Sequence, residues 1–69
     1  MKGADMDEKR LMRLPEVCRI CGLSRSEIYR LISLFRFPRS VPLGARAVAW
    51  DWDEVQAWIS ERIAARKAA

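Results

Sequence analysis

GLSRSEIYRLI, residues 22–32, is the stretch of this 69-residue chain that decides its fold. Gly22 predicts the end of one short helix, because glycine readily adopts the left-handed conformation that terminates helices. Ser24 is typical of a helix N-cap, and Glu27 follows it at the spacing of a capping box. The stretch therefore predicts two helices joined by a tight turn.

The second of these helices, expected from about Ser24 to Leu34, has two faces of different chemistry. Apolar residues recur with the period of one buried helical face. These residues are Ile28, Leu31, Ile32 and Phe35. The opposite side presents Ser26, Tyr29, Arg30 and Ser33. Hydroxyls, a tyrosine and an arginine on a helix that follows a tight turn are typical of a DNA-recognition helix.

The first helix is expected from about Pro15 to Cys21, because proline is favoured at the first helical position. Val17 and Cys21 are its predicted buried residues. After the second helix, Phe37-Pro38 predicts a break, since a residue that precedes proline avoids the helical conformation.

A short hairpin is expected next. Gly44-Ala45 suits a two-residue type II′ turn between Val41-Pro42-Leu43 and a strand from Arg46 to Trp50, with Arg46 near the tip. Pro42 cannot donate a ladder hydrogen bond, so its strand is predicted at the edge of the sheet. Val48 and Trp50 share a face and are expected to pack inward.

Asp51 is the predicted N-cap of the last helix, because Glu54 stands three residues on and the first turn is acidic. Its predicted buried stripe consists of Val55, Trp58, Ile59 and Ile63. Trp52 is the tryptophan expected to be exposed. The predicted fold is mainly α with a small β-hairpin: a compact winged helix-turn-helix over residues 11–65, between a flexible tail (1–10) and a frayed C-terminus (66–69).

The net charge of +4 is concentrated in the middle of the chain. The segment from Lys9 to Val48 contains nine basic and two acidic residues, and every cation from residue 13 to residue 46 is an arginine. The planar guanidinium suits phosphate oxygens and guanine edges better than an ammonium does. The charge distribution therefore indicates a nucleic-acid partner.

Several other classes are disfavoured. The chain has no run of 18 apolar residues and no apolar signal-peptide core, so we expect a cytoplasmic protein without membrane contact. Cys18 and Cys21 form a CxxC, but the absence of histidine leaves no complete metal site, and both are interpreted as small buried hydrophobic residues. Nothing resembles a catalytic group, a cofactor loop or a small-molecule substrate site, so an enzyme is not expected.

Several motifs of this chain, in this order, resemble those of the AlpA family. That family comprises small phage- and prophage-type transcriptional regulators related to excisionases and MerR-like domains. They are LPEV (14–17), GLSRSEIYRLI (22–32), FPR (37–39), LGARAVAW (43–50) and EVQAWI (54–59). The resemblance covers about residues 11–62 and implies a DNA-binding regulator. The chain departs from the family pattern where Leu34 and Phe35 replace a small Ala-Gly-like pair, and where Ala45 and Ala49 replace hairpin glycines.

The predicted DNA contacts fall into two groups. Residues expected to read base edges are Arg25, Ser26, Tyr29, Arg30 and Ser33. Ser24, with the free N–H groups of its helix, is expected to hold a phosphate as well as cap the helix. Arg39 and Arg46, with Arg13 and Arg36 as further candidates, are expected on phosphates. Arg46 is also placed to enter a minor groove.

Three assignments stay open on sequence alone. Tyr29 either reads DNA or packs flat against the hairpin, and Arg25 either contacts DNA or forms a salt bridge. Leu34 and Phe35 either continue the core or, with Trp52, form a surface for a protein partner.

The predicted function is that of a sequence-specific double-stranded DNA-binding transcriptional regulator, expected as a homodimer or cooperative array on DNA. An integrase or RNA polymerase is a further candidate partner. The alternatives are an excisionase-like protein that bends DNA, and a protein-interaction adaptor or antitoxin.

Overall fold

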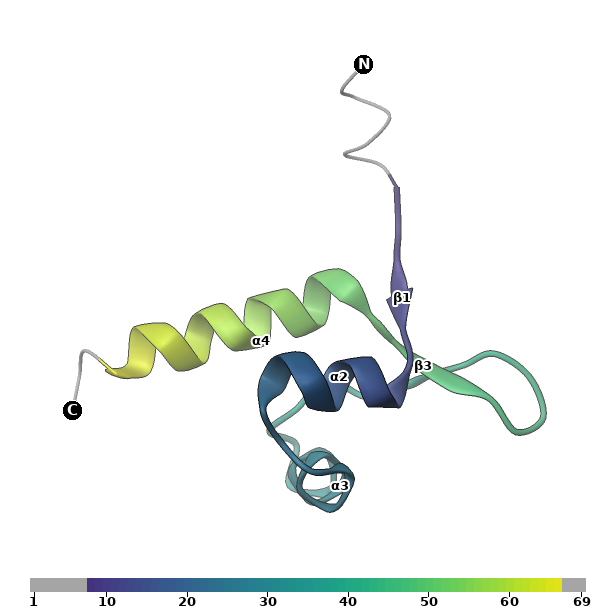
Figure 1. Cartoon of the computed structure of the whole chain (residues 1–69), viewed down its shortest axis with the longest axis horizontal. Helices are drawn as coiled ribbons and strands as arrows, with labels where there is room; N and C mark the ends of the chain where they lie inside the picture. The colour runs from purple at the N-terminus through teal and green to yellow at the C-terminus, as the bar shows by residue number, and fades with distance from the viewer. Residues whose placement is uncertain (1–7, 67–69) are drawn as a thin grey trace.

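The computed structural model describes residues 8–66. In chain order, the elements are β1 (Leu11–Met12), α2 (Leu14–Cys21), α3 (Arg25–Ser33), β2 (Val41–Pro42), β3 (Val48–Asp51) and α4 (Trp52–Ala65). The strands form one antiparallel sheet in the order β1-β3-β2 (Figure 1). The described residues thus form a mostly helical, winged helix-turn-helix, which confirms the predicted fold.

The corner between α2 and α3 is built as predicted. Pro15 lies in the first turn of α2, and Gly22 ends the helix with a left-handed φ of 72°. The N–H groups of Gly22 and Leu23 both donate to the carbonyl of Cys18, at 2.9 and 3.2 Å. These bonds close the end of α2 and redirect the chain, so that α3 begins three residues after Gly22.

The core is small and centred on Trp50. Its fully buried large side chains are Trp50, Ile28, Val17 and Val55. The indole N–H of Trp50 donates to the carbonyl of Pro38 at 3.0 Å, so this buried donor has a partner. One residue from each of α2, α3, β3 and α4 is therefore held in a single cluster, which fixes α3 relative to the sheet.

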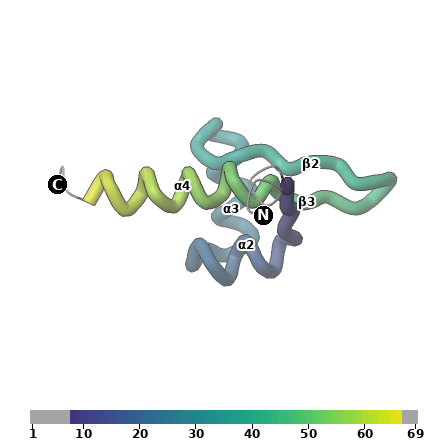
Figure 2. Tube along the Cα trace, turned by 90° about the horizontal axis from the view of Figure 1, so that it is seen from above, coloured from purple at the N-terminus to yellow at the C-terminus, as the bar shows by residue number. Residues whose placement is uncertain are grey.

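Two extended parts leave this core in opposite directions. Figure 2 shows the β2–β3 hairpin projecting to one side and α4 to the other, while α2 and α3 lie near the middle. In Figure 1, α3 lies at the lower edge of the molecule, and α2 lies between α3 and α4. One side of α3 is thus free of the rest of the described chain.

The sheet differs from the predicted two-stranded hairpin in two respects. β1 adds a third strand, with Met12 opposite Trp50; two residues are too short to show an alternating pattern. The predicted two-residue turn at Gly44-Ala45 is wrong, because Pro42 pairs with Val48 and the N–H of Leu43 donates to Ala47 at 2.7 Å. This register leaves residues 44–46 in the loop, and among the described glycines only Gly22 has a positive φ. Pro42 does lie on an edge strand, as predicted.

The prediction that Phe35 belongs to the apolar face of α3 is also wrong. The helix ends at Ser33, and Phe35 takes a left-handed φ of 60° and is 86% exposed. The N–H of Phe35 donates to Ile32 and that of Arg36 to Leu31, which is the bonding pattern of a Schellman motif. The chain therefore turns away one residue before Phe35 could reach the core.

Smaller differences concern α4, α2 and the ends of the chain. Ile63 is 53% exposed, because α4 extends beyond the body of the protein, whereas Val55 is buried and Trp58 and Ile59 pack against the core. Cys21 is half-buried rather than buried, and Trp52 is half-buried rather than exposed. The predicted tails, 1–10 and 66–69, lie largely outside the described residues.

Candidate nucleic-acid interface

The N-terminus of α3 is fixed by its cap. Ser24 Oγ accepts a hydrogen bond from the N–H of Glu27 at 3.1 Å, which satisfies one of the free donors of the first turn. The N–H of Ile28 donates to the carbonyl of Ser24, and the buried Ile28 side chain orients the helix. The opposite face consequently points to solvent. All six predicted α3 residues are exposed: Ser24, Arg25, Ser26, Tyr29, Arg30 and Ser33.

Tyr29 lies between this face and the wing, which is the hairpin formed by β2, residues 43–47 and β3. Its ring meets Trp50 of β3 edge-on, with centroids 6.3 Å apart and planes at 62°, and the residue is 44% exposed. The packing on the hairpin strand is present, but it is edge-to-face rather than flat. Tyr29 thus supports the sheet with part of its ring and presents the rest to solvent.

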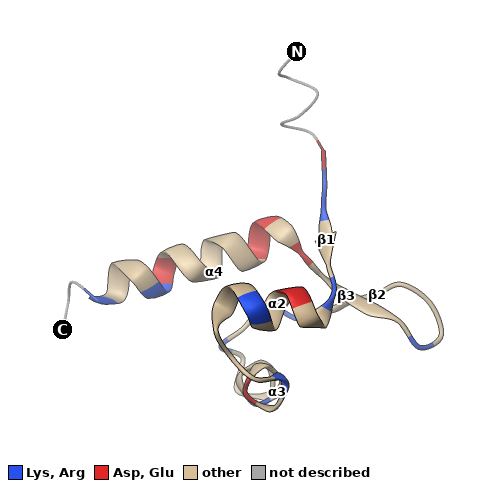
Figure 3. Cartoon of the chain, in the orientation of Figure 1, with Lys and Arg blue, Asp and Glu red and all other residues tan. Residues whose placement is uncertain are grey.

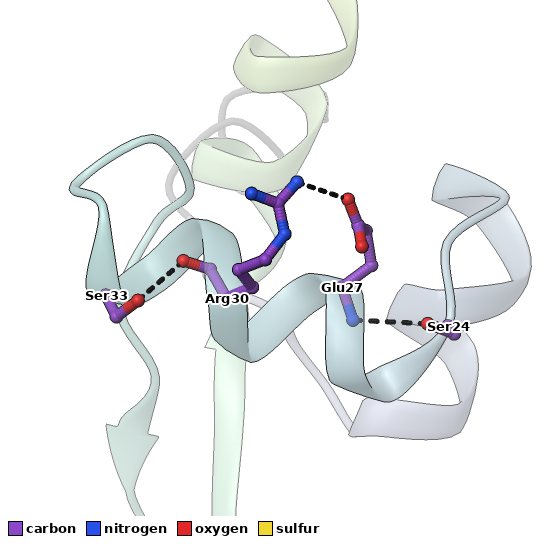
Figure 4. Close-up of polar contacts among 4 residues, drawn as sticks. All are labelled: Ser24, Glu27, Arg30 and Ser33. Carbon is purple, nitrogen blue, oxygen red and sulfur yellow. Dashed lines mark hydrogen bonds and ion pairs between the residues drawn. The ribbon is translucent and has the colours of Figure 1, made fainter.

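Arg30 is paired along the helix. Its Nη2 donates to Glu27 Oε2 at 2.5 Å (Figure 4). This hydrogen bond, with the charge attraction, lowers the pKa of the Glu27 carboxyl and raises that of Arg30. The Glu27 side chain is thus paired with Arg30. Of the two hydrogen bonds of the predicted capping box, the described residues form the one from the N–H of Glu27 to Ser24 Oγ, and not the one from the N–H of Ser24 to the Glu27 carboxylate.

Glu27 also belongs to this candidate interface, although its spacing from Ser24 predicts only a capping role. The signal was available, because glutamate and arginine three residues apart on a helix are neighbours on its surface. Within residues 8–66 the ion pairs are Glu27–Arg30 and Glu16–Arg19 on α2. Arg25 forms neither, so the salt-bridge alternative for Arg25 has no support in the described chain.

Ser33 stands at the other end of the α3 face. Its hydroxyl donates to the carbonyl of Arg30 at 2.7 Å (Figure 4). The proton is therefore used within the helix, and the oxygen lone pairs remain free to accept. Ser33 can receive a hydrogen bond from a base amino group more readily than it can donate one.

The two arginines predicted outside α3 come from separate segments. Arg46 lies in the exposed loop of residues 44–46, and Figure 3 shows a basic segment at the hairpin tip. Arg39 is exposed in the segment before β2, as are Arg13 and Arg36 in their own segments. The structure therefore brings six predicted residues together on α3 and leaves the wing as a second, distinct basic position.

The thiols, the metal-ligating side chains and the helix lengths of residues 8–66 can also be described. No cluster of metal-ligating side chains is present there. Cys18 and Cys21 are free and half-buried, and burial raises the pKa of the Cys21 thiol. None of the described helices combines the length and apolar character needed to cross a bilayer.

Comparison with known proteins identifies the family of this chain. Residues 10–63 match the family model described as Prophage CP4-57 regulatory protein (AlpA). The chain belongs to the AlpA family. The match includes every element from β1 to α3, the wing and most of α4, so it covers the whole candidate interface.

The chain is also similar to two curated proteins, one of which carries the AlpA name. The uncharacterized protein ORF88 of Enterobacteria phage P4 is 52% identical over 63 residues, which cover 91% of this chain and 72% of that protein. The DNA-binding transcriptional activator AlpA of Escherichia coli (strain K12) is 32% identical, with 77% of this chain and 84% of that protein covered. The chain is thus similar both to a phage protein and to a named regulator.

Proposed function

We propose that this AlpA-family chain is a sequence-specific double-stranded DNA-binding transcriptional regulator of the phage and prophage type. The observation that carries the proposal is the face of α3. A helix anchored by the fully buried Ile28 presents hydroxyls, a tyrosine and two arginines to solvent. The relative named as a DNA-binding transcriptional activator supports the same conclusion.

The proposed mechanism places α3 in the major groove. The free N–H groups of its first turn carry partial positive charge and suit a phosphate at the groove edge. Arg25 and Arg30 would donate to guanine O6 and N7, the commonest specific contact, and each such contact discriminates against other bases by about 1–3 kcal/mol. Ser26, Tyr29 and Ser33 would complete the contact with neighbouring base edges.

The wing would supply a contact that depends less on the DNA sequence. Arg46 at the tip suits the phosphate backbone or a narrow minor groove, where the negative potential attracts arginine. Arg39 would add a phosphate contact. Each phosphate neutralised releases condensed counterions, so the affinity of the protein for duplex DNA should fall steeply with salt concentration. Dimers or cooperative arrays would extend the short site that one module covers.

A second candidate function is supported by one observation. Leu34 and Phe35 are 47% and 86% exposed at the end of α3, and exposed apolar side chains that adjoin one another are typical of protein contacts. An adaptor or antitoxin would use this surface without specific DNA binding. A regulator or excisionase-like protein that contacts integrase or RNA polymerase would use it beside the DNA interface.

The test is selection of preferred sites from random duplexes, followed by a salt titration on the selected site. We expect a defined preferred sequence, a linear fall of log affinity with log salt, and loss of the preference in Arg30→Ala. Arg19→Ala is the matched control, because Arg19 forms the same type of ion pair on α2. An adaptor would select no sequence, and an excisionase-like protein would measurably bend the selected duplex.

A further inference from the structure

The carboxylate of Glu27 lies on the face proposed to meet an anion. Glu27 is in the first turn of α3 and its side chain remains 40% exposed while paired with Arg30. Its negative charge offsets the positive charge of Arg30, so the pair attracts a phosphate less strongly than an unpaired arginine would. Glu27 thus weakens backbone contacts through Arg30.

The ion pair also restricts where Arg30 can reach. Glu27 and Tyr29 lie on opposite flanks of the outward face of α3, and Tyr29 packs against Trp50 of the wing strand. Glu27 therefore draws the Arg30 guanidinium to the flank away from the wing. Arginine has five N–H donors, and the ion pair with Glu27 uses Nη2, which leaves other N–H groups for a planar two-bond contact.

We propose that Glu27 is a specificity-determining positioning residue: it holds the guanidinium of Arg30 for a guanine edge and disfavours its transfer to phosphate. An arginine released from this pair would gain the freedom to follow the backbone, which raises affinity for any sequence. This inference rests on the proposed function, because it assigns a role within the same DNA interface.

The same helix-surface geometry occurs once more among the described residues, and it supplies a control. Glu16 and Arg19 on α2 are also three residues apart, with 2.7 Å between Oε2 and Nη2. Glu16→Gln removes the same charge as Glu27→Gln, from the helix that is not proposed to read bases. Any effect of net charge alone would appear in both variants.

The experiment measures affinity for the selected duplex and for a random duplex at several salt concentrations. In Glu27→Gln we expect tighter binding of the random duplex and a specific-to-random ratio that falls about tenfold, within the range for loss of one guanine contact. The slope of log affinity against log salt concentration (the salt slope), measured on the random duplex, should steepen by about 0.9, as expected for one added phosphate contact. Glu16→Gln should leave the ratio within about twofold of wild type.

Two further variants separate positioning from other roles. In an Arg30→Ala background, Glu27→Gln should no longer tighten binding of the random duplex or steepen its salt dependence, because Glu27 acts through Arg30. Glu27→Asp keeps the charge and should retain most of the ratio, which separates loss of the charge from a change of side chain alone.

A Glu27→Gln ratio equal to that of Glu16→Gln, or an effect that persists without Arg30, would overturn the inference while the proposed function stands. Wild-type protein that binds no duplex in a salt-dependent way would overturn both.

Discussion

The backbone at Phe35 leads to a prediction in which two substitutions that remove the same ring differ in stability. Phe35 has a φ of 60°, which costs an L-residue roughly 1–2 kcal/mol, and the residue is 86% exposed. Phe35→Ala keeps the Cβ and therefore the strain. Phe35→Gly removes the strain, but costs about 0.4–1 kcal/mol because the unfolded chain gains freedom. The glycine variant should consequently be the more stable of the two by about 1 kcal/mol.

The assay is thermal unfolding of both variants, followed by circular dichroism. For a domain of this size, about 1 kcal/mol corresponds to a Tm difference of about 4–8 °C. Leu34 is the control, because its φ of −93° is accessible to any residue, so Leu34→Gly should be less stable than Leu34→Ala. A Phe35→Gly variant that unfolds at or below the temperature of Phe35→Ala would refute the left-handed assignment and the Schellman ending of α3.

Three further predictions concern α3 and the wing. Ser24→Ala removes the acceptor of the Glu27 N–H and should destabilise the protein by about 1 kcal/mol; an unchanged Tm would show that the cap contributes nothing. Carboxyl NMR should give Glu27 a pKa below its ordinary value of 4.5, and Arg30→Ala should return it to that value. The associated stabilisation is present above pH 4.5 and is lost as the pH falls through the lowered pKa; an unshifted pKa in wild type would contradict the ion pair. Arg46→Ala should reduce the salt slope of DNA binding by about 0.9 with the same base preference, and a changed preference would instead place Arg46 on bases.

The features that could be predicted from sequence are those fixed by local chemistry. Gly22, Ser24 and Asp51 each act on backbone groups within a few residues, so the helix boundaries they predict agree closely with the structure. Trp50 could be placed in the core because a large aromatic residue on an inward-facing strand position has few other stable environments. The edge position of Pro42 followed from its missing N–H.

The features that were missed depend on contacts between distant parts of the chain or on where a helix stops. Periodicity extends the face of α3 through Phe35, and no residue in that pattern indicates that the helix ends at Ser33. The wing loop was misassigned because glycine indicates a turn, while pairing of Pro42 with Val48 decides how many residues the loop contains. β1 forms only because Met12 pairs with Trp50, far along the chain.

In the candidate site, too, some features could be predicted from the sequence and others could not. The exposed face of α3 could be predicted, because helical geometry alone determines which residues lie opposite Ile28. The partners of each side chain could not, since Glu27 has two nearby donors, the helix backbone and Arg30. The structure resolves this choice in favour of Arg30.

The central claim is that the exposed face of α3 and the wing tip bind duplex DNA, and NMR mapping of the backbone amides tests it most directly. On addition of the selected duplex, we predict that the largest signal changes lie in residues 24–33 and 44–46, and that raising the salt concentration reverses them. Changes confined to the outer side of α4 or to Leu34 and Phe35, with α3 unaffected, would contradict the claim.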